Sequence, residues 1–351
     1  MKPFAAVSKP PTSSTGRLRT WIKRLLLDIP AAVVLLLIAG VLYQSIATQI
    51  DRRIFPPHGQ MVDVGGYRLH LNCAGVYSSQ QPTVILETGL GGLATSSDWA
   101  WVQPEVARTT LVCAYDRAGL GWSDPGPQPR DARHIAAELH TLLQASHTPG
   151  PYVLVGWSYG GLYAREYAGQ YPQEVAGLVL VDSSSPEQCA FSPAWEAQCA
   201  STVKNASRAA LLAPFGVLRL VGLFQPPTGL PEPQKQELLA SFSSQKDWAA
   251  QKAELQATPD TDAQVLAAQT LGSRPVYVLT ATDHNAPPEL EQQWQAWQSG
   301  YTALSTNSAQ RVVEGATHNS LVFSPTDSKI TAAAILQVVD SVRTGKGLSS
   351  P

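Results

Sequence analysis

The chain has 351 residues, with 25 Lys and Arg against 27 Asp and Glu, which gives a formal net charge of −2. This balance argues against nucleic acid as a partner, because phosphate binding needs a surplus of clustered cations. A hydrophobic content of 44% is enough for a sizeable core, and a charged content of 15% excludes a disordered chain or a coiled coil. The length fits one α/β enzyme with an insertion.

The first feature along the chain is an uncharged stretch at residues 29–50, whose most apolar part is Ile29–Tyr43. As a helix it is about 33 Å long, close to the roughly 30 Å of a bilayer hydrocarbon core. Basic residues gather before it, so the positive-inside rule makes residues 1–28 a basic cytoplasmic tail. We expect this tail to lack regular structure. A transmembrane signal-anchor at 29–50 and a linker at 51–60 would then place the following domain outside the cytoplasm, in the periplasm or extracellular space.

Two other interpretations of this stretch stay open. Small residues in Ser45-Ile46-Ala47 fit the cleavage site of a secretory signal peptide, although the basic segment before it is long for one. A buried core helix is the third interpretation, which the terminal position and basic flank disfavour.

Beyond the linker, apolar runs alternate with helical patterns. Gly65-Gly66 between two alternating runs predicts a hairpin, and later runs are continuously apolar, as in a parallel sheet buried on both faces. The pattern predicts an α/β fold. The alternation breaks at residues 186–272, which we interpret as a helical insertion. The core then comprises residues 61–185 and 273–345, and residues 346–351 form a tail.

The strongest motif is Gly156-Trp157-Ser158-Tyr159-Gly160, which follows an apolar strand and begins a helix. This context is the nucleophile elbow, a strand-to-helix turn that needs small flanking residues and exposes the serine at the sheet edge. The following helix N-terminus favours developing negative charge. We therefore predict that Ser158 is a catalytic nucleophile.

A serine hydroxyl needs a general base and an acid that orients the base. His318 lies in the loop after the last predicted strand and is the candidate base. Asp283 follows the seventh strand and is the predicted acid, while Asp182, after the sixth, remains a second candidate. Asp182 heads Ser183-Ser-Ser-Pro186, where a carboxylate can also serve as a local hydrogen-bond acceptor.

The oxyanion of an acyl-transfer intermediate needs two backbone donors. One candidate is the N–H of Tyr159, directly after the nucleophile. The other is the N–H of Leu90, with Gly91 as an alternative, in the glycine-rich loop 87–92.

These motifs give residues 60–345 a resemblance to the α/β-hydrolase superfamily. It is carried by Thr88-Gly-Leu-Gly91, Tyr115-Asp-Arg-Ala-Gly-Leu-Gly-Trp-Ser123, the elbow, Asp283 and His318. The resemblance implies an α/β-hydrolase fold, with an eight-stranded, mostly parallel sheet, an antiparallel second strand, helices on both faces and a helical lid at 186–272. It gives Asp116 a structural role only. Many relatives have His-Gly where this chain has Thr88-Gly89, and relatives with Asp at the elbow, such as epoxide hydrolases, are disfavoured by Ser158.

The lid carries the apolar stretch 211–224, whose single charge is Arg219. It either packs on the core or lines the substrate pocket, or it touches the bilayer beside the anchor. All of these interpretations favour a substrate with an apolar part. Cys189 and Cys199 are predicted to pair, whereas Cys73 and Cys113 are expected to be buried thiols.

Together these patterns predict a membrane-anchored serine hydrolase that cleaves an ester or related acyl bond. It would act through an acyl-enzyme, with no cofactor and no metal. Hydrolysis of amide, peptide, lactone or carbon–carbon bonds remains open, as does a non-catalytic binding protein of the same fold.

Overall fold

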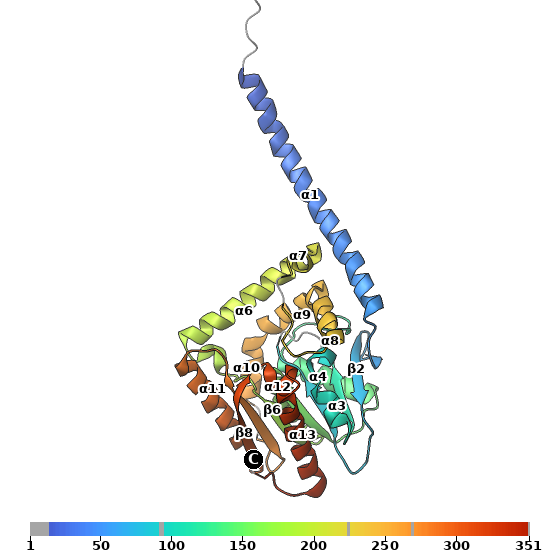
Figure 1. Cartoon of the computed structure of the whole chain (residues 1–351), viewed down its shortest axis with the longest axis vertical. Helices are drawn as coiled ribbons and strands as arrows, with labels where there is room; N and C mark the ends of the chain where they lie inside the picture. The colour runs from blue at the N-terminus through green and yellow to red at the C-terminus, as the bar shows by residue number, and fades with distance from the viewer. Residues whose placement is uncertain (1–13, 91–94, 223–224, 268–269, 350–351) are drawn as a thin grey trace, which may run out of the picture.

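A computed structural model describes residues 14–90, 95–222, 225–267 and 270–349. Its most conspicuous element is helix α1, Ser14–Ile54, which projects away from a rounded α/β domain (Figure 1). Within α1, Leu26–Ile54 is long and apolar enough to cross a membrane. Large apolar side chains along it are exposed, among them Leu35 and Leu36.

Helix α1 is longer at both ends than the predicted span 29–50. Residues 14–28 of the predicted tail are helical, so the expectation that they lack regular structure is wrong; residues 1–13 lie outside the described part. The predicted linker 51–60 is helical as far as Ile54 and then reaches Pro56-Pro57, which cannot continue a helix. Arg52 and Arg53 in the last turn favour the added turn, because cations stabilise the negative end of the helix dipole.

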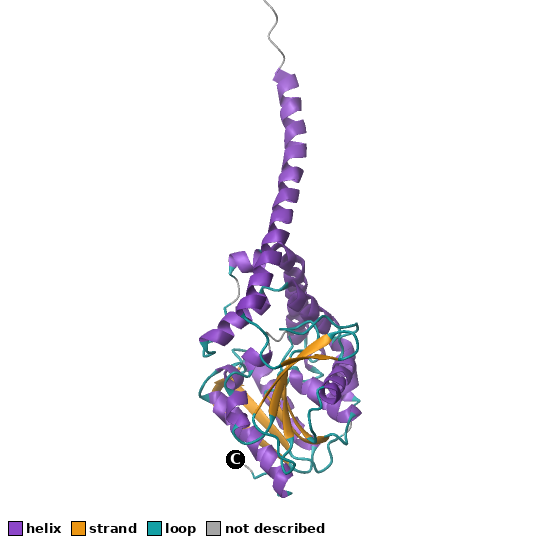
Figure 2. Ribbon diagram, turned by 90° about the vertical axis from the view of Figure 1, so that its right-hand side faces the viewer, coloured by secondary structure: helices purple, strands orange, loops and turns teal. Residues whose placement is uncertain are grey.

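The described residues form one eight-stranded sheet in the order β1-β2-β4-β3-β5-β6-β7-β8, seen edge-on among helices in Figure 2. Strand β2 is antiparallel to both of its neighbours, and the strands from β4 to β8 are parallel to one another. The strands are β1 Gln60–Asp63, β2 Arg68–Ala74, β3 Thr83–Glu87, β4 Val112–Tyr115, β5 Tyr152–Trp157, β6 Val175–Val181, β7 Val276–Asp283 and β8 Ser308–Thr317. The predicted hairpin and fold class are therefore confirmed.

Apolar cores on both faces of the sheet hold the helices. One contains side chains of α3 and α13, and the other contains side chains of α4 and α5. The N-terminus of α4 is capped by Asp131, which accepts a hydrogen bond from the N–H of His134 at 3.0 Å. The core helices are α2 Thr95–Asp98, α3 Val102–Ala107, α4 Ala132–Ala145, α5 Gly160–Gln170, α11 Pro288–Gly300, α12 Ser320–Phe323 and α13 Asp327–Thr344, with the 3₁₀ turn η3 Tyr301–Leu304.

A helical lid joins β6 to β7, as the break in the strand pattern predicted. It lies over the carboxyl ends of the parallel strands, and α6 rises from the domain toward α1 (Figure 1). Its elements are η1 Gln188–Ala190, α6 Pro193–Leu212, η2 Ala213–Phe215, α7 Val217–Val221, α8 Glu232–Phe242, α9 Gln245–Gln256 and α10 Thr258–Leu266.

All four cysteines form disulfides. Cys189–Cys199 links η1 to α6, which confirms the predicted pair. Cys73 and Cys113 are also bonded, so the expectation of buried thiols is wrong. The reason is sheet order: β2 pairs with β4, and their register places Cys73 directly opposite Cys113.

Candidate active site

Ser158 occupies a tight turn between β5 and α5. Its backbone is left-handed, with φ at +56°, a conformation rare for residues other than glycine. A Cβ at Gly156 would lie 2.5 Å from the carbonyl oxygen of Gly160, so the flanking positions must be small. The turn therefore has the local geometry expected of a nucleophile elbow.

The loop after β3 lies directly against this turn. A Cβ at Gly89 would be only 3.0 Å from the Cβ of Ser158, and the Leu90 side chain belongs to the apolar cluster that contains Tyr159. Neither Leu90 nor Tyr159 donates its backbone N–H to any residue that the structure describes. Both groups are thus available to an oxyanion; the alternative, Gly91, lies outside the described residues.

A fully buried arginine fixes this loop. Arg117 donates to the carbonyl oxygens of Thr88 at 2.9 Å and Gly89 at 2.8 Å. The same guanidinium pairs with Glu87 at 2.6 Å and with Glu254 of lid helix α9 at 2.8 Å. Burial raises the pKa of Glu87 to about 7, although Arg117 opposes the shift. One side chain therefore couples the loop after β3 to the lid.

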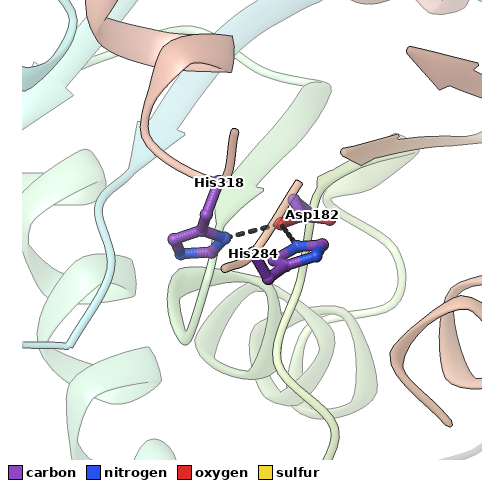
Figure 3. A group of neighbouring side chains, drawn as sticks. All are labelled: Asp182, His284 and His318. Carbon is purple, nitrogen blue, oxygen red and sulfur yellow. Dashed lines mark hydrogen bonds and ion pairs between the residues drawn. The ribbon is translucent and has the colours of Figure 1, made fainter. Parts of the chain in front are cut away.

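His318 follows β8 and meets an aspartate from β6. Its Nδ1 lies 2.6 Å from Oδ2 of Asp182, as Figure 3 shows. Because an ionised carboxylate only accepts hydrogen bonds, Nδ1 carries the proton and Nε2 is left as the acceptor. The described residues offer Nε2 no hydrogen-bond partner. This tautomer is the one required to take a proton from a serine hydroxyl.

The partner of His318 corrects the prediction made for Asp283. Asp283 is exposed and accepts a hydrogen bond from the N–H of Asn285 at 3.2 Å, whereas Asp182 is fully buried beside the elbow. The N–H of Ser158 donates to the carbonyl oxygen of Val181 at 3.1 Å, so the nucleophile turn abuts the residue before Asp182. Strand β7 continues to Asp283 after a register shift against β8, which leaves that carboxylate beyond the site.

A second histidine, which the sequence had not singled out for a role, shares the same carboxylate oxygen. Nε2 of His284 lies 2.7 Å from Oδ2 of Asp182, and its Nδ1 lies 2.8 Å from Oε2 of Glu291 (Figure 3 shows the contact with Asp182). Two carboxylates can accept from both ring nitrogens only if both are protonated. Burial alone would lower the pKa of His284, but Asp182 and Glu291 outweigh it and raise that pKa above its usual value.

Asp182 is held ionised by its surroundings. Its other oxygen accepts hydrogen bonds from the Trp294 ring N–H at 2.9 Å and the Ala281 N–H at 3.0 Å. Burial by itself raises the pKa of Asp182, but the bonds from His284 and His318 hold it well below its usual value.

Asp182, His284 and His318 are also residue types that bind metals, and their ligand atoms lie within 4.8 Å of one another. Their arrangement fits hydrogen bonding better. One nitrogen of each histidine lies 2.6–2.7 Å from the same carboxylate oxygen, at the short end of the range of charge-assisted N–H···O bonds. We therefore interpret the cluster as a hydrogen-bonded group in which both histidines donate to Asp182.

A sequence profile of the alpha/beta hydrolase family matches residues 88–331, well over half of the chain. The chain belongs to this family. An AB hydrolase superfamily protein of Gibberella zeae is 36% identical over 109 residues, covering 30% of this chain and 33% of that protein. The chain covers only between 18% and 50% of the first curated relatives it matches.

Solved structures share the fold at lower identity. A thermophilic esterase from Thermogutta terrifontis has a TM-score of 0.57 at 20% identity, covering 81% of this chain and 98% of that one. The epoxide hydrolase CorEH has a TM-score of 0.60 at 21% identity, covering 80% and 97%. At these identities the likeness is one of fold, so the chemistry must be argued from this chain's own residues.

Proposed function

We propose that this protein is a serine hydrolase that cleaves an ester or related acyl bond. The observation that carries the proposal is the Asp182–His318 hydrogen bond beside the strained elbow of Ser158. The ring N–H of Trp157, the residue before the nucleophile, donates to the carbonyl oxygen of His318 at 3.1 Å, so the elbow and the histidine loop are joined. The proposed nucleophile, acid and base thus lie in the loops that follow β5, β6 and β8, at the carboxyl ends of the parallel strands.

The mechanism follows from these roles. Ser158 Oγ attacks the carbonyl carbon while Nε2 of His318 takes its proton, and Asp182 stabilises the resulting imidazolium. The N–H groups of Leu90 and Tyr159 bind the oxyanion. His318 then protonates the leaving alcohol, and a water molecule, deprotonated by the same histidine, releases the acid from the acyl-enzyme. No cofactor enters any step.

A serine-directed probe tests this function. Full-length protein should be labelled by a fluorophosphonate and should hydrolyse a soluble p-nitrophenyl ester. Ser158→Ala should abolish labelling and lower kcat by several orders of magnitude with the fold intact. Near-normal turnover by this variant would refute the mechanism, and absence of labelling in a folded wild-type protein would favour a non-catalytic binding protein. A panel of amide and lactone substrates would then separate the bond types.

We further propose that α1 anchors the catalytic domain to a membrane, with the domain outside the cytoplasm. The exposed apolar span Leu26–Ile54 supports the anchor. The two disulfides support an oxidising compartment. Protease added to intact bacterial spheroplasts should digest the domain; digestion only after lysis would refute this topology. The mass of the mature chain distinguishes the anchor from a cleaved signal peptide.

A further inference from the structure

The lid touches α1 within the apolar part of that helix. We define the lid tip as Leu211–Val221, which comprises the end of α6, the 3₁₀ turn η2 and helix α7 (Figure 1). A Cβ at Gly40 would lie 2.6 Å from the carbonyl oxygen of Phe215, and a Cβ at Gly216 would lie 2.7 Å from the Tyr43 ring. The two backbones are therefore in close contact at this level of α1.

Polar contacts secure the lid just below that level. Gln44 of α1 is 4% exposed and donates to the carbonyl oxygen of Ser243 at 2.6 Å. Arg219, the only charged residue of the lid tip, pairs with Asp51 at 2.6 Å. The charge on the tip is thus neutralised by α1 itself, which lowers the cost of bringing the tip to an apolar phase.

The lid tip exposes large apolar side chains. Its exposed side chains have exposed fractions of 69% for Leu211, 39% for Leu212, 69% for Leu220 and 54% for Val221. Close to its contact with the tip, α1 also exposes large apolar side chains, among them Val41 and Leu42. Leu223 and Phe224, which complete the apolar stretch of the sequence, lie outside the described residues.

The position of this surface relative to the anchor decides what covers it. The strongly apolar part of α1 ends at Tyr43, and about 20 helical residues cross a hydrocarbon core. About 20 residues counted from Ile29 end at Thr48, so Gly40 and Tyr43, which contact Phe215 and Gly216, lie in the outer half of such a span. We propose that the lid tip inserts into the outer interface of the bilayer, with Leu211, Leu212, Leu220 and Val221 among the lipids.

This inference rests on the proposed anchor and deepens the proposed hydrolase function. The same lid covers the sheet edge that carries Ser158, and its helix α9 holds Arg117 through Glu254. A lid seated in the interface offers the site acyl substrates from the membrane. The substrate class is then an amphiphilic ester of the outer leaflet rather than a freely soluble one.

Site-specific fluorescence tests the insertion. Because all four native cysteines are in disulfides, Leu220→Cys adds the only free thiol, which can be labelled with the polarity-sensitive fluorophore NBD. The full chain is then reconstituted in phosphatidylcholine vesicles with and without a spin-labelled phosphatidylcholine. We expect blue-shifted NBD emission and several-fold stronger quenching than at a control position outside the membrane.

The control position is Val76→Cys. Val76 is 81% exposed and follows β2. The last residue of β2 pairs with the first residue of β4, so Val76 lies near the amino ends of the parallel strands, away from the lid. Leu36→Cys, in the middle of the span, is the positive control. If the label at residue 36 is quenched but the label at residue 220 is quenched no more than the label at residue 76, the inference is overturned and the anchor stands. Absence of quenching at residue 36 overturns the anchor and the inference together.

Activity gives an independent readout. The double variant Leu220→Ser, Val221→Ser should lose about tenfold in turnover of a long-chain ester presented in vesicles, while hydrolysis of a soluble p-nitrophenyl ester stays unchanged. Val76→Ser should change neither rate. Unchanged vesicle turnover in the double variant contradicts membrane delivery of substrate. A wild-type protein that hydrolyses neither ester contradicts the proposed function, and leaves the fluorescence result on insertion standing.

Discussion

Replacing Asp182 by Asn is the most informative single change at the site, because the sequence predicted Asp283 as the partner of His318 and the structure has Asp182 there. The carboxylate accepts four hydrogen bonds, from His318 Nδ1 at 2.6 Å, His284 Nε2 at 2.7 Å, Trp294 at 2.9 Å and the Ala281 N–H at 3.0 Å. An asparagine can keep the last two bonds through its oxygen. Its amide hydrogens would then face the two histidine nitrogens.

The consequences for rate and stability can be estimated separately. Facing the new amide group, His318 must carry its proton on Nε2 instead of Nδ1, so Nε2 can no longer accept the proton of Ser158. A comparable change in a serine protease costs about 10⁴ in kcat, equivalent to about 5 kcal/mol. Disrupting a buried charged pair costs about 3–5 kcal/mol of folding stability. Because its pKa is held below the ordinary value, Asp182 stabilises the wild type above about pH 4, and this contribution is lost as pH falls.

The assay compares Asp182→Asn with Asp283→Asn. Both full-length variants are measured for kcat on p-nitrophenyl ester and for unfolding by urea, with circular dichroism to verify folding. Asp283 is exposed, so its replacement should change kcat by less than about threefold and stability by at most about 0.5 kcal/mol. A large loss of kcat in Asp283→Asn with near-full activity in Asp182→Asn would refute the assignment of the acid.

Two further predictions concern the lid. Glu254→Gln removes one of the two carboxylates that pair with buried Arg117 and should lower stability by roughly 2–3 kcal/mol. It should also lower kcat/KM, because Arg117 holds the loop of the proposed oxyanion donor Leu90. Thermal unfolding that matches the wild type would contradict this prediction. Opening the Cys189–Cys199 disulfide by Cys→Ser at both positions should cost about 3 kcal/mol in urea unfolding, and an unchanged midpoint would show that the lid does not depend on this bond.

The residues that could be placed from sequence are those whose signal is local. Ser158 and Tyr159 follow from a five-residue motif between a strand and a helix, and His318 from its place after the last strand. The Leu90 loop is recognisable by its glycines. In each case neighbours in the chain determine the conformation, so no knowledge of distant contacts is needed.

The features that escaped sequence reasoning depend on contacts between distant segments. Asp182 and Asp283 both end parallel strands, and only the packing of β6, β7 and β8 decides which carboxylate meets His318. The structure separates the two in one further way: Asp182 directly follows β6 in a left-handed conformation, with φ at +45°, as Ser158 does after the adjacent strand β5. The Cys73–Cys113 bond likewise follows from β2 lying beside β4, an order that the sequence does not display.

His284 leads to a prediction about pH and stability. Its ring lies between the carboxylates of Asp182 and Glu291, near the Trp294 ring at 4.9 Å and the His318 ring at 6.2 Å between centroids. These carboxylates raise its pKa in the folded protein above the ordinary value, despite the opposing effect of burial. A group whose pKa is raised on folding stabilises the protein fully below its unfolded pKa, about 6.5 for histidine, and loses that contribution as pH rises through the folded value.

His284→Gln should therefore destabilise the protein most at low pH. Charged hydrogen bonds contribute about 1.5–3 kcal/mol each, so a loss of roughly 2 kcal/mol is expected at about pH 5.5 and a smaller one at about pH 9. Urea unfolding of the two proteins at both values measures the difference, and Glu291→Gln, which removes one of the two carboxylates, should shift stability in the same direction. A pH-independent difference would mean that His284 acts by packing alone. The interpretation that both histidines donate to Asp182 would then have to be replaced by a simple Asp182–His318 pair.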